Sequence, residues 1–567
     1  MSKRVSVSAI IIISFFLSTS LQAEVFNVTS QQEFDNAHDT AALNDTIVWN
    51  SGTYSDIFMD IDNDRLFIMA EELGGTIFTG ASRVDISSDY ITLQGFQFLN
   101  GDIGTRDVIN TRGSFNIFTQ INIRSYTCYK YLRVREQSQF CEITFCNFEN
   151  RLNLDDQNIL SILVDRNNPG YHKIQFCSFK NFAGTGNDLG IEPIRIGVSS
   201  QADFNSRTVV EFCYFTQCNG DGEIISSKAG QNVYRFNTFE NNPLSELVLR
   251  HGSENIVYGN FFVSGKGGVR VREGQDHYIY NNYFFDLEDR AIYLQNDDSD
   301  PLDNINIAFN TIVDCDRVRL GGNGNDQPTG VTFANNIFSD PENNIFDDET
   351  GTETWVGNIS NGPLGIPMPE NGMTLVDPQL QINSEGFFGL AANSPAINAA
   401  QSNFDTLPQF PDIAEIDTEV LFDLMGQARP SSIEERDLGC NEFPHNILIT
   451  PRATEENTGP SYNTSTSTSV DNRAQVEINL MEINPNPVFN DLNITIFNKR
   501  EATLKVDIFN IEGKRVFNFA GKTFPPGRNT MSKRIGNLQS GVYIVHIIGQ
   551  DVQGDKVFQS TQFVKSN

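Results

Sequence analysis

Four stretches of eight residues decide the fold: ITFCNFEN (143–150), IQFCSFKN (174–181), VEFCYFTQ (210–217) and YRFNTFEN (234–241). Each alternates apolar and polar residues, as a short strand does, and carries Cys or Asn at one recurring position. The same pattern recurs further along the chain. An apolar residue stands two places after the Cys or Asn in all eight copies, at Phe148, Phe179, Phe215, Phe239, Phe262, Phe284, Ile312 and Phe338.

The copies are 22 to 36 residues apart, which is typical of a solenoid built from stacked coils. We therefore predict an all-β protein, a right-handed parallel β-helix. A β-propeller is the rival, but these repeats are too short for four-stranded blades. Buried asparagines are costly unless they pair, so a recurring Asn predicts an amide ladder from coil to coil. Its members are Asn237, Asn260, Asn282, Asn310 and Asn336.

The chain has 567 residues and a net charge of −32, with a composition typical of folded soluble proteins. Such acidity argues against broad binding to nucleic acid or to anionic membranes. Residues 1–23 have a basic start at Lys3 and Arg4, an apolar run over 9–17 and a plausible cleavage site before Glu24. These are the features of a secretory signal peptide, and no later stretch predicts a membrane span.

Export makes the eight cysteines of interest, because disulfides persist outside the cell. Cys146, Cys177 and Cys213 occupy the same place in successive repeats, which predicts a buried stack. Their spacing leaves open whether any pair is oxidised.

The repeat pattern fades after about residue 340, and we predict that the β-helix unit covers 24–444. Residues 445–475 form a polar linker rich in Thr, Ser and Asn. Residues 476–567 alternate as an antiparallel β-sandwich does. NPNP (484–487) and LQSGVYIV (538–545) make this unit resemble the C-terminal sorting domain of the type IX secretion system of Bacteroidetes. A generic sandwich, such as a carbohydrate-binding module, is the alternative.

Charged residues concentrate in the coils between 184 and 280. In a parallel β-helix, residues one repeat apart lie side by side, so several of these charges can share one face. Asp221 and Glu223 are two positions apart and face the same side, where a hard cation such as Ca²⁺ would relieve their repulsion. Lys228 near other cations is a candidate base. The remaining candidates on this face are Glu192, Arg250 and Arg270.

Three motifs in this region, GEIISSK (222–228), LVLRHG (247–252) and GGVRV (267–271), resemble those of polysaccharide lyase family 6. This family includes alginate lyases and lyases of the chondroitinase B type. The resemblance covers most of 24–444 and implies β-elimination from a uronate polymer. It implies that Lys228 is the Brønsted base and that Arg250 is the general acid. Because guanidinium stays protonated, Arg250 is better described as stabilising the enolate and leaving oxygen.

The resemblance also implies that Asp221 and Glu223 bind calcium and that His251 and Arg270 contact the substrate. The family often has Asn at the position of Leu189, where it binds the metal. Asn187 or Asp188 could replace it after a local shift, and Glu192 is either a further ligand or a turn carboxylate. The expected cofactor is therefore Ca²⁺.

The sequence thus predicts a secreted or surface-attached lyase acting on an anionic polysaccharide, with alginate as the expected polymer, by calcium-assisted β-elimination to 4,5-unsaturated uronate ends. Its other expected partner is the type IX secretion machinery. The alternatives are a chondroitin or dermatan sulfate lyase and a non-catalytic surface protein that binds glycans. A hydrolase of the polygalacturonase type would need clustered aspartates rather than a lysine base.

Overall fold

The computed structural model describes residues 23–565 with gaps. The gaps are 154–156, 185, 187–189, 296–300, 322–326, 342, 349, 384, 403, 405–419, 445–449, 451, 463–477, 485–490, 499–500, 511–514, 526, 537, 540 and 552–555. Residues 1–22 of the predicted signal peptide, and residues 445–449, 451 and 463–475 of the predicted linker, therefore lie outside the described part. Among the described residues, no helix has both the length and the apolar character needed to cross a bilayer.

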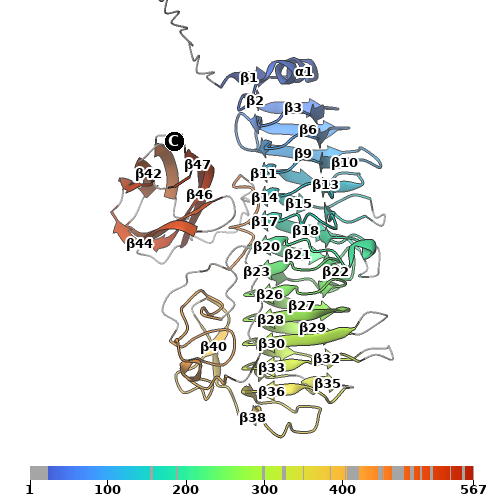
Figure 1. Cartoon of the computed structure of the whole chain (residues 1–567), viewed down its shortest axis with the longest axis vertical. Helices are drawn as coiled ribbons and strands as arrows, with labels where there is room; N and C mark the ends of the chain where they lie inside the picture. The colour runs from blue at the N-terminus through green and yellow to red at the C-terminus, as the bar shows by residue number, and fades with distance from the viewer. Residues whose placement is uncertain are drawn as a thin grey trace, which may run out of the picture.

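The predicted all-β parallel β-helix is confirmed. Its strands stack in three columns, with the N-terminal coil at the top of Figure 1 and the last coil at the bottom. The first column is a parallel sheet of β1 (Val25–Val28), β2 (Thr46–Trp49), β5 (Phe67–Ala70), β8 (Thr92–Gln94), β11 (Ile117–Thr119), β14 (Glu142–Thr144), β17 (Lys173–Gln175), β20 (Val209–Glu211), β23 (Val233–Arg235), β26 (Ile256–Tyr258), β28 (Gly274–Tyr280), β30 (Leu302–Ala308), β33 (Thr332–Ala334) and β36 (Thr354–Val356).

The second column contains the predicted Phe positions. Its strands are β3 (Gly52–Ser55), β6 (Thr76–Gly80), β9 (Phe96–Gly101), β12 (Asn122–Arg124), β15 (Asn147–Glu149), β18 (Ser178–Phe182), β21 (Tyr214–Cys218), β24 (Thr238–Glu240), β27 (Phe261–Val271), β29 (Tyr283–Leu294), β31 (Thr311–Cys315), β34 (Ile337–Ser339), β37 (Asn358–Ser360) and β38 (Met373–Leu375).

The third column carries the candidate site. Its strands are β4 (Phe58–Ile61), β7 (Arg83–Ile86), β10 (Asp107–Thr111), β13 (Lys130–Val134), β16 (Leu160–Ile162), β19 (Ile194–Ile196), β22 (Glu223–Ser227), β25 (Glu246–Leu249), β32 (Val318–Leu320) and β35 (Phe346–Asp348). Between β25 and β32, the long strands β27 and β29 serve both columns and join them into one sheet.

The core is held by ladders of identical side chains, as the repeat predicts. The amide ladder continues one rung further than expected, to Asn358, and each Asn Nδ2 donates to the Oδ1 of the next over 2.9–3.1 Å. The phenylalanines stack beside it, from Phe148 to Phe284, with ring centroids 4.7–5.1 Å apart. Parallel pairing thus places each side chain on its own counterpart, which satisfies amides and packs rings at once.

All eight cysteines are buried and free. The Sγ atoms of Cys146, Cys177 and Cys213 each approach a carbonyl oxygen of the preceding coil, over 3.4–3.6 Å. The predicted cysteine stack is therefore present as thiols. Burial raises the pKa of Cys146 and Cys177 well above the ordinary thiol value, which disfavours the reactive thiolate.

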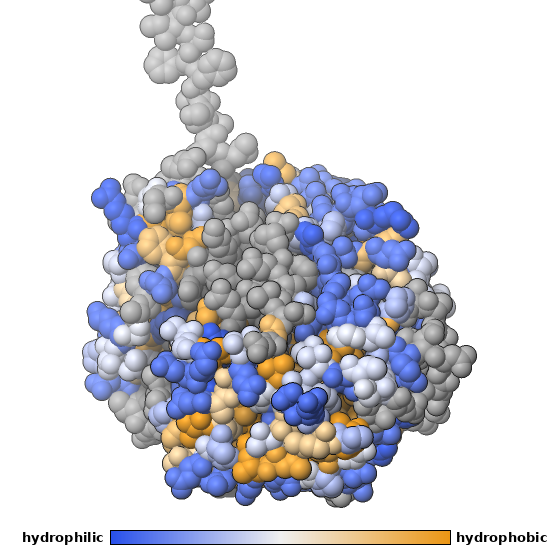
Figure 2. Space-filling model, turned by 60° about the horizontal axis from the view of Figure 1, so that its bottom comes forward, coloured by the Kyte–Doolittle hydropathy of each residue, from blue (hydrophilic) through white to orange (hydrophobic). Residues whose placement is uncertain are grey.

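A short helix closes the N-terminal end of the solenoid. Helix α1 (Gln31–Thr40) begins after Ser30, whose hydroxyl accepts the Glu33 N–H. Its buried Phe34 stacks on Trp49 of β2 with ring centroids 5.8 Å apart. The open first coil is thereby shielded from water (Figure 1). At the opposite end, which comes forward in Figure 2, hydrophobic residues lie among a mostly hydrophilic surface.

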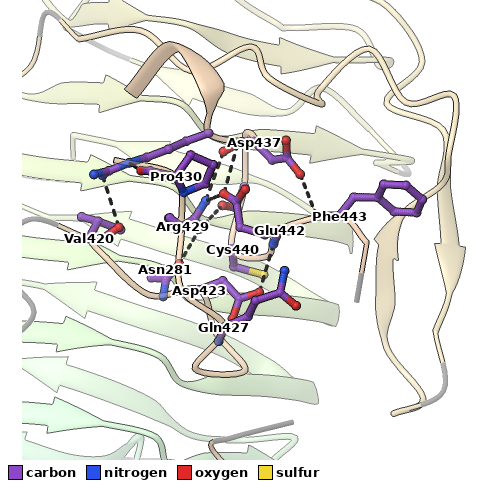
Figure 3. A network of polar contacts seen from close by, with 12 residues as sticks. Asn281, Val420, Asp423, Gln427, Arg429, Pro430, Asp437, Cys440, Glu442 and Phe443 are labelled. Atoms are coloured by element: carbon purple, nitrogen blue, oxygen red, sulfur yellow. Dashed lines mark hydrogen bonds and ion pairs between the residues drawn. The ribbon is translucent and has the colours of Figure 1, made fainter. Parts of the chain in front are cut away.

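The residues after the last coil return along the solenoid. Their anchor is Arg429, a fully buried arginine (Figure 3). Its guanidinium donates to Glu442 over 2.6 Å and to Asn281, in a turn of the solenoid, over 2.9 Å. It also lies 4.8 Å from the ring centre of Phe309. This network fixes the segment 420–444 against the outside of the coils.

Part of the predicted polar linker also lies against the solenoid. Arg452 pairs with Glu240 over 2.8 Å, and the Gly459 N–H donates to the Phe176 carbonyl oxygen over 2.8 Å. The Tyr462 hydroxyl donates to the Gln120 carbonyl oxygen over 2.9 Å. Residues 452–462 therefore run back toward the N-terminal coils.

The C-terminal unit consists of two antiparallel sheets. One contains β41 (Ile478–Asn484), β42 (Asp491–Asn498) and β45 (Gly527–Arg534), and the other β43 (Ala502–Asn510), β44 (Arg515–Phe524), β46 (Gly541–Asp551) and β47 (Lys556–Lys565). Buried residues from both sheets, among them Ile494 and Val545, form one core. The predicted small antiparallel unit is thus present.

The Arg429 network gives a stability prediction. Arg429→Met should lower the free energy of unfolding by about 3–5 kcal/mol, because Glu442 is left buried without its cation. Urea denaturation followed by fluorescence measures the change. The double variant Arg429→Met/Glu442→Gln removes the unpaired charge and should recover much of the loss. A single variant as stable as the wild type would contradict this account of how the segment is held.

Candidate active site

The site forms where β22 and β25 end, on neighbouring coils. Lys228 follows β22, and its backbone N–H donates to the Ile196 carbonyl oxygen over 2.7 Å. The N–H groups of Arg250 and His251, which follow β25, both donate to the Ser227 carbonyl oxygen, over 2.8 and 3.0 Å. Lys228 and Arg250 thus leave the sheet at adjacent levels of the stack, one strand spacing of about 4.8 Å apart.

Two carboxylate–guanidinium pairs surround Lys228. Arg250 Nη1 donates to Glu223 Oε1 over 2.5 Å. On the preceding coil, Arg195 Nη2 lies 2.7 and 2.6 Å from the two carboxylate oxygens of Glu192, and its Nε donates to the same carboxylate over 3.0 Å. Both carboxylates are almost completely buried. Such charge-assisted contacts hold the two arginines in fixed positions.

Lys228 is half-buried between these pairs, and its pKa is lowered from the ordinary lysine value. Burial is the largest cause, followed by the positive charge of Arg195, and Arg250 acts in the same direction. Glu192 and Glu223 oppose the shift. The amine is therefore easier to deprotonate than an exposed lysine, as a general base requires.

The two paired carboxylates shift in opposite directions. Burial raises the pKa of Glu192, and Arg195 only partly offsets it. Burial also acts to raise the pKa of Glu223, but the Arg250 guanidinium helps to outweigh it, and the pKa falls below the ordinary value. Glu223 is thus held as a carboxylate, and it keeps Arg250 in place beside Lys228.

The predicted calcium ligands that the structure describes make contacts with protein groups. Asp221 is buried and accepts N–H groups from Gly190, over 2.6 Å, and Glu223, over 3.1 Å. Glu192 and Glu223 are engaged by guanidinium groups. Among the described residues, Glu223 Oε2 is a buried carboxylate oxygen without a hydrogen-bond partner. Asn187, Asp188 and Leu189 lie outside the described residues.

Calcium prefers six to eight oxygen ligands. In the described part of the chain, no three His, Cys, Asp or Glu side chains gather in a way that could hold a metal ion. The donors that are described therefore do not fit a calcium cage, because arginines take up two of the three carboxylates. The calcium site stays a prediction.

The predicted substrate-contacting residues lie on the following coils. His251 Nδ1 is 2.6 Å from Glu273 Oε2, which fixes the orientation of the imidazole. Arg270 Nη1 is 3.9 Å from Glu246 Oε1. Glu246 is fully buried and accepts from Arg290 over 2.7 and 3.2 Å. The structure thus brings all the described candidates to one face of the solenoid.

Sequence reasoning missed Arg195, Glu246 and Arg290. Arg195 was visible, because it stands three residues after Glu192 in EPIRIG (192–197), but its pairing with that carboxylate depends on a turn that the sequence does not specify. Glu246 and Arg290 are 44 residues apart in the sequence, and only the pairing of the strands in the sheet brings them together.

A chemical capacity follows from this arrangement. A lysine with a lowered pKa can accept a proton, and an adjacent guanidinium can stabilise negative charge that develops nearby. The half-exposed Lys228 lies beside Arg250, so both can reach one bound substrate. Residues 28–346, more than half of the chain, match the family described as chondroitinase B. The chain belongs to the chondroitinase B family of polysaccharide lyases.

Solved structures agree with the fold of this chondroitinase B family member. The PL6 alginate lyase AlyGC is 22% identical, with a TM-score of 0.59, over 69% of this chain and 60% of its own. A mannuronic acid-specific family 6 lyase from human gut microbiota is 22% identical, with a TM-score of 0.56, over 62% of this chain and 91% of its own. A PL6 alginate lyase in complex with a trisaccharide is 18% identical, with a TM-score of 0.52, over 68% and 94%.

The chain therefore spans 60% of the length of AlyGC and most of the other two. A comparison with curated proteins finds no match. Residues 482–559 match the secretion system C-terminal sorting domain, which confirms the predicted identity of the C-terminal unit. Its presence supports secretion through the type IX system, whereas the signal peptide stays a prediction.

The ion pair between Arg195 and Glu192 gives a prediction about pH. Arg195→Gln removes a positive charge close to Lys228 and frees the negative charge of Glu192, and both changes raise the pKa of Lys228. The acidic limb of the kcat/KM profile on a cleaved polysaccharide should therefore move to higher pH. Arg124→Gln, an exposed arginine in the second column, is the control. An unmoved limb in Arg195→Gln would contradict the electrostatic role of Arg195.

Proposed function

We propose that this chain is a secreted lyase that cleaves alginate by β-elimination, with Lys228 as the base. The observation that carries the proposal is the half-buried Lys228, with its lowered pKa, held one coil from an arginine that is itself fixed by Glu223. Membership of the chondroitinase B family supports the reaction class. The alginate lyases among the similar structures favour alginate as the polymer.

The reaction can be written with the chain's own residues. The neutral amine of Lys228 takes the proton from C5 of a uronate, and negative charge develops on its carboxylate. Arg250 stabilises that charge. The C4–O bond then breaks, its electron pair leaves with the oxygen, and a C4=C5 double bond forms. The leaving oxygen takes up a proton from the lysine ammonium or from water, so that one new hydroxyl end and one unsaturated end result.

Substitution of the base tests this mechanism directly. Lys228→Ala should lower kcat by about 10²–10⁴-fold, because general base catalysis is lost. Arg250→Gln should lower it by about 10²–10³-fold through lost charge stabilisation. The rise in ultraviolet absorbance of the unsaturated uronate measures both. Lys173→Ala, a lysine on β17 in the first column, should behave as the wild type.

The choice of polymer is settled in the same assay. Alginate and its mannuronate-rich and guluronate-rich fractions are compared with dermatan sulfate, chondroitin sulfate and pectate. The name of the matching family favours dermatan sulfate as the second candidate substrate. If the protein cleaves dermatan sulfate alone, that polymer replaces alginate as the proposed substrate. If no polymer gives an absorbance rise, with or without added calcium, the lyase proposal fails and a surface protein that binds glycans becomes the better account.

Chelation tests the predicted calcium requirement. Because Arg195 and Arg250 already neutralise Glu192 and Glu223, we expect dialysis against EDTA to leave most of the activity in place. Activity before and after dialysis, and after Ca²⁺ is added back, gives the answer. Loss of activity that Ca²⁺ restores would show the calcium requirement predicted from the sequence.

A further inference from the structure

One outward position on each strand of the third column forms a continuous row along the solenoid. The pairing register puts these residues directly above one another, and we call them the register row. Its members are Asp60, Asp85, Asn110, Arg133, Ser161, Arg195, Ser226, Val248, Arg270, Tyr293, Arg319 and Asp347.

The central part of the register row contains only positively charged and uncharged residues. Between Arg133 and Arg319 it contains four arginines and no carboxylate, although the chain has a net charge of −32. Carboxylates return beyond both ends, at Asp85 and at Asp347. Each of the four arginines also has a carboxylate within 4.0 Å, from Asp107, Glu192, Glu246 and Asp347, respectively. Guanidinium groups spaced along several coils suit an extended anion rather than a compact one.

The candidate active site lies inside this stretch. Lys228 is two residues after Ser226, and Arg250 is two residues after Val248, so both emerge on the face of the register row. Arg133 lies three coils before Ser226, and Arg319 lies four coils after it. Seven strand spacings separate the two, or about 34 Å.

The row alternates long cations with small or buried residues. Ser161, Ser226 and Val248 are buried, whereas the side chains of Arg133 and Arg319 are 20% and 28% exposed. Neighbouring arginines are thereby kept at least two coils apart, about 9.6 Å, which limits their repulsion.

The two outermost arginines each lie near one carboxylate and one aromatic ring. Arg133 Nη1 lies 3.8 Å from Asp107 Oδ2, and Arg319 Nε lies 3.5 Å from Asp347 Oδ2. Both distances are beyond the usual range of N–H···O hydrogen bonds. Their guanidinium carbons lie 5.6 Å from the ring centre of Tyr129 and 5.0 Å from that of Tyr293, respectively. An aromatic ring orients a guanidinium without using all its N–H donors, so the remaining N–H groups can still donate to a ligand carboxylate.

We propose that Arg133 and Arg319 bind substrate carboxylates at the two ends of a track that follows the solenoid axis. The ligand is an unsulfated polyuronate with one carboxylate on each sugar. The solenoid rises about 4.8 Å from one coil to the next, which is similar to the length of one sugar unit in an extended chain. The seven spacings between Arg133 and Arg319 therefore take about seven sugars. This inference rests on the proposed function and adds that the enzyme acts best on long chains.

Kinetics on substrates of different length test the track. Arg133→Gln and Arg319→Gln should each raise KM for the polymer on the order of tenfold, with little change in kcat, because one charge-assisted contact remote from the reaction is lost. A trisaccharide placed across Lys228 cannot reach both ends, so its turnover should be unchanged in at least one of the two variants. The wild-type kcat/KM should rise with chain length up to about seven sugars. Arg124→Gln is the matched control, because it removes one exposed positive charge outside the third column.

Binding measured without turnover separates this inference from the proposed reaction. In the Lys228→Ala background, Arg133→Gln and Arg319→Gln should weaken retardation in gels that contain alginate, and Arg124→Gln should not. If the wild type cleaves polyuronate and both variants keep the wild-type KM and retardation, the track is overturned and the lyase reaction still stands. Wild-type protein that cleaves no polyuronate, yet shows retardation that both variants weaken, would overturn the lyase and leave the track.

Discussion

The structure depends on parallel pairing of each coil with the next at one strand spacing. This constraint brings identical residues together, and it is favourable only when their side chains attract or pack against one another. The asparagine ladder from Asn237 to Asn358 satisfies that condition, because each amide donates to one neighbour and accepts from the other. Each rung fixes the register for all the strands of its coil. The position of every residue on the third column follows from it.

The same pairing explains how an acidic protein lines up several arginines on one face. Parallel stacking would place like charges one spacing apart, so the arginines of the register row are separated by Ser, Val or Tyr. The carboxylates Glu192, Glu223 and Glu246 are buried beside the row and hold guanidinium groups in place. Burial and the positive charges of Arg195 and Arg250 lower the pKa of Lys228, and together they outweigh the opposing effect of Glu192 and Glu223.

The sequence showed the fold because a solenoid repeats its core. The recurring Cys or Asn and the Phe two places later mark the same point in successive coils, and the ladders formed where the repeat placed them. The motifs around Lys228, Arg250 and Arg270 also placed the candidates on one face, since residues on neighbouring coils follow the same register. The small C-terminal unit was evident from its alternation and its turn residues.

The sequence alone therefore determined the solenoid, its amide ladder, the sorting domain and the lysine–arginine pair, because each is written in local or repeated patterns. Only the tertiary structure decided which charges pair. Arg195 joins Glu192, Arg290 joins Glu246 from 44 residues away, and Arg429 joins Glu442 against the outer turns. The register row likewise combines single residues from twelve strands. Coil lengths vary from repeat to repeat, so spacing in the sequence cannot show which of these residues lie in line.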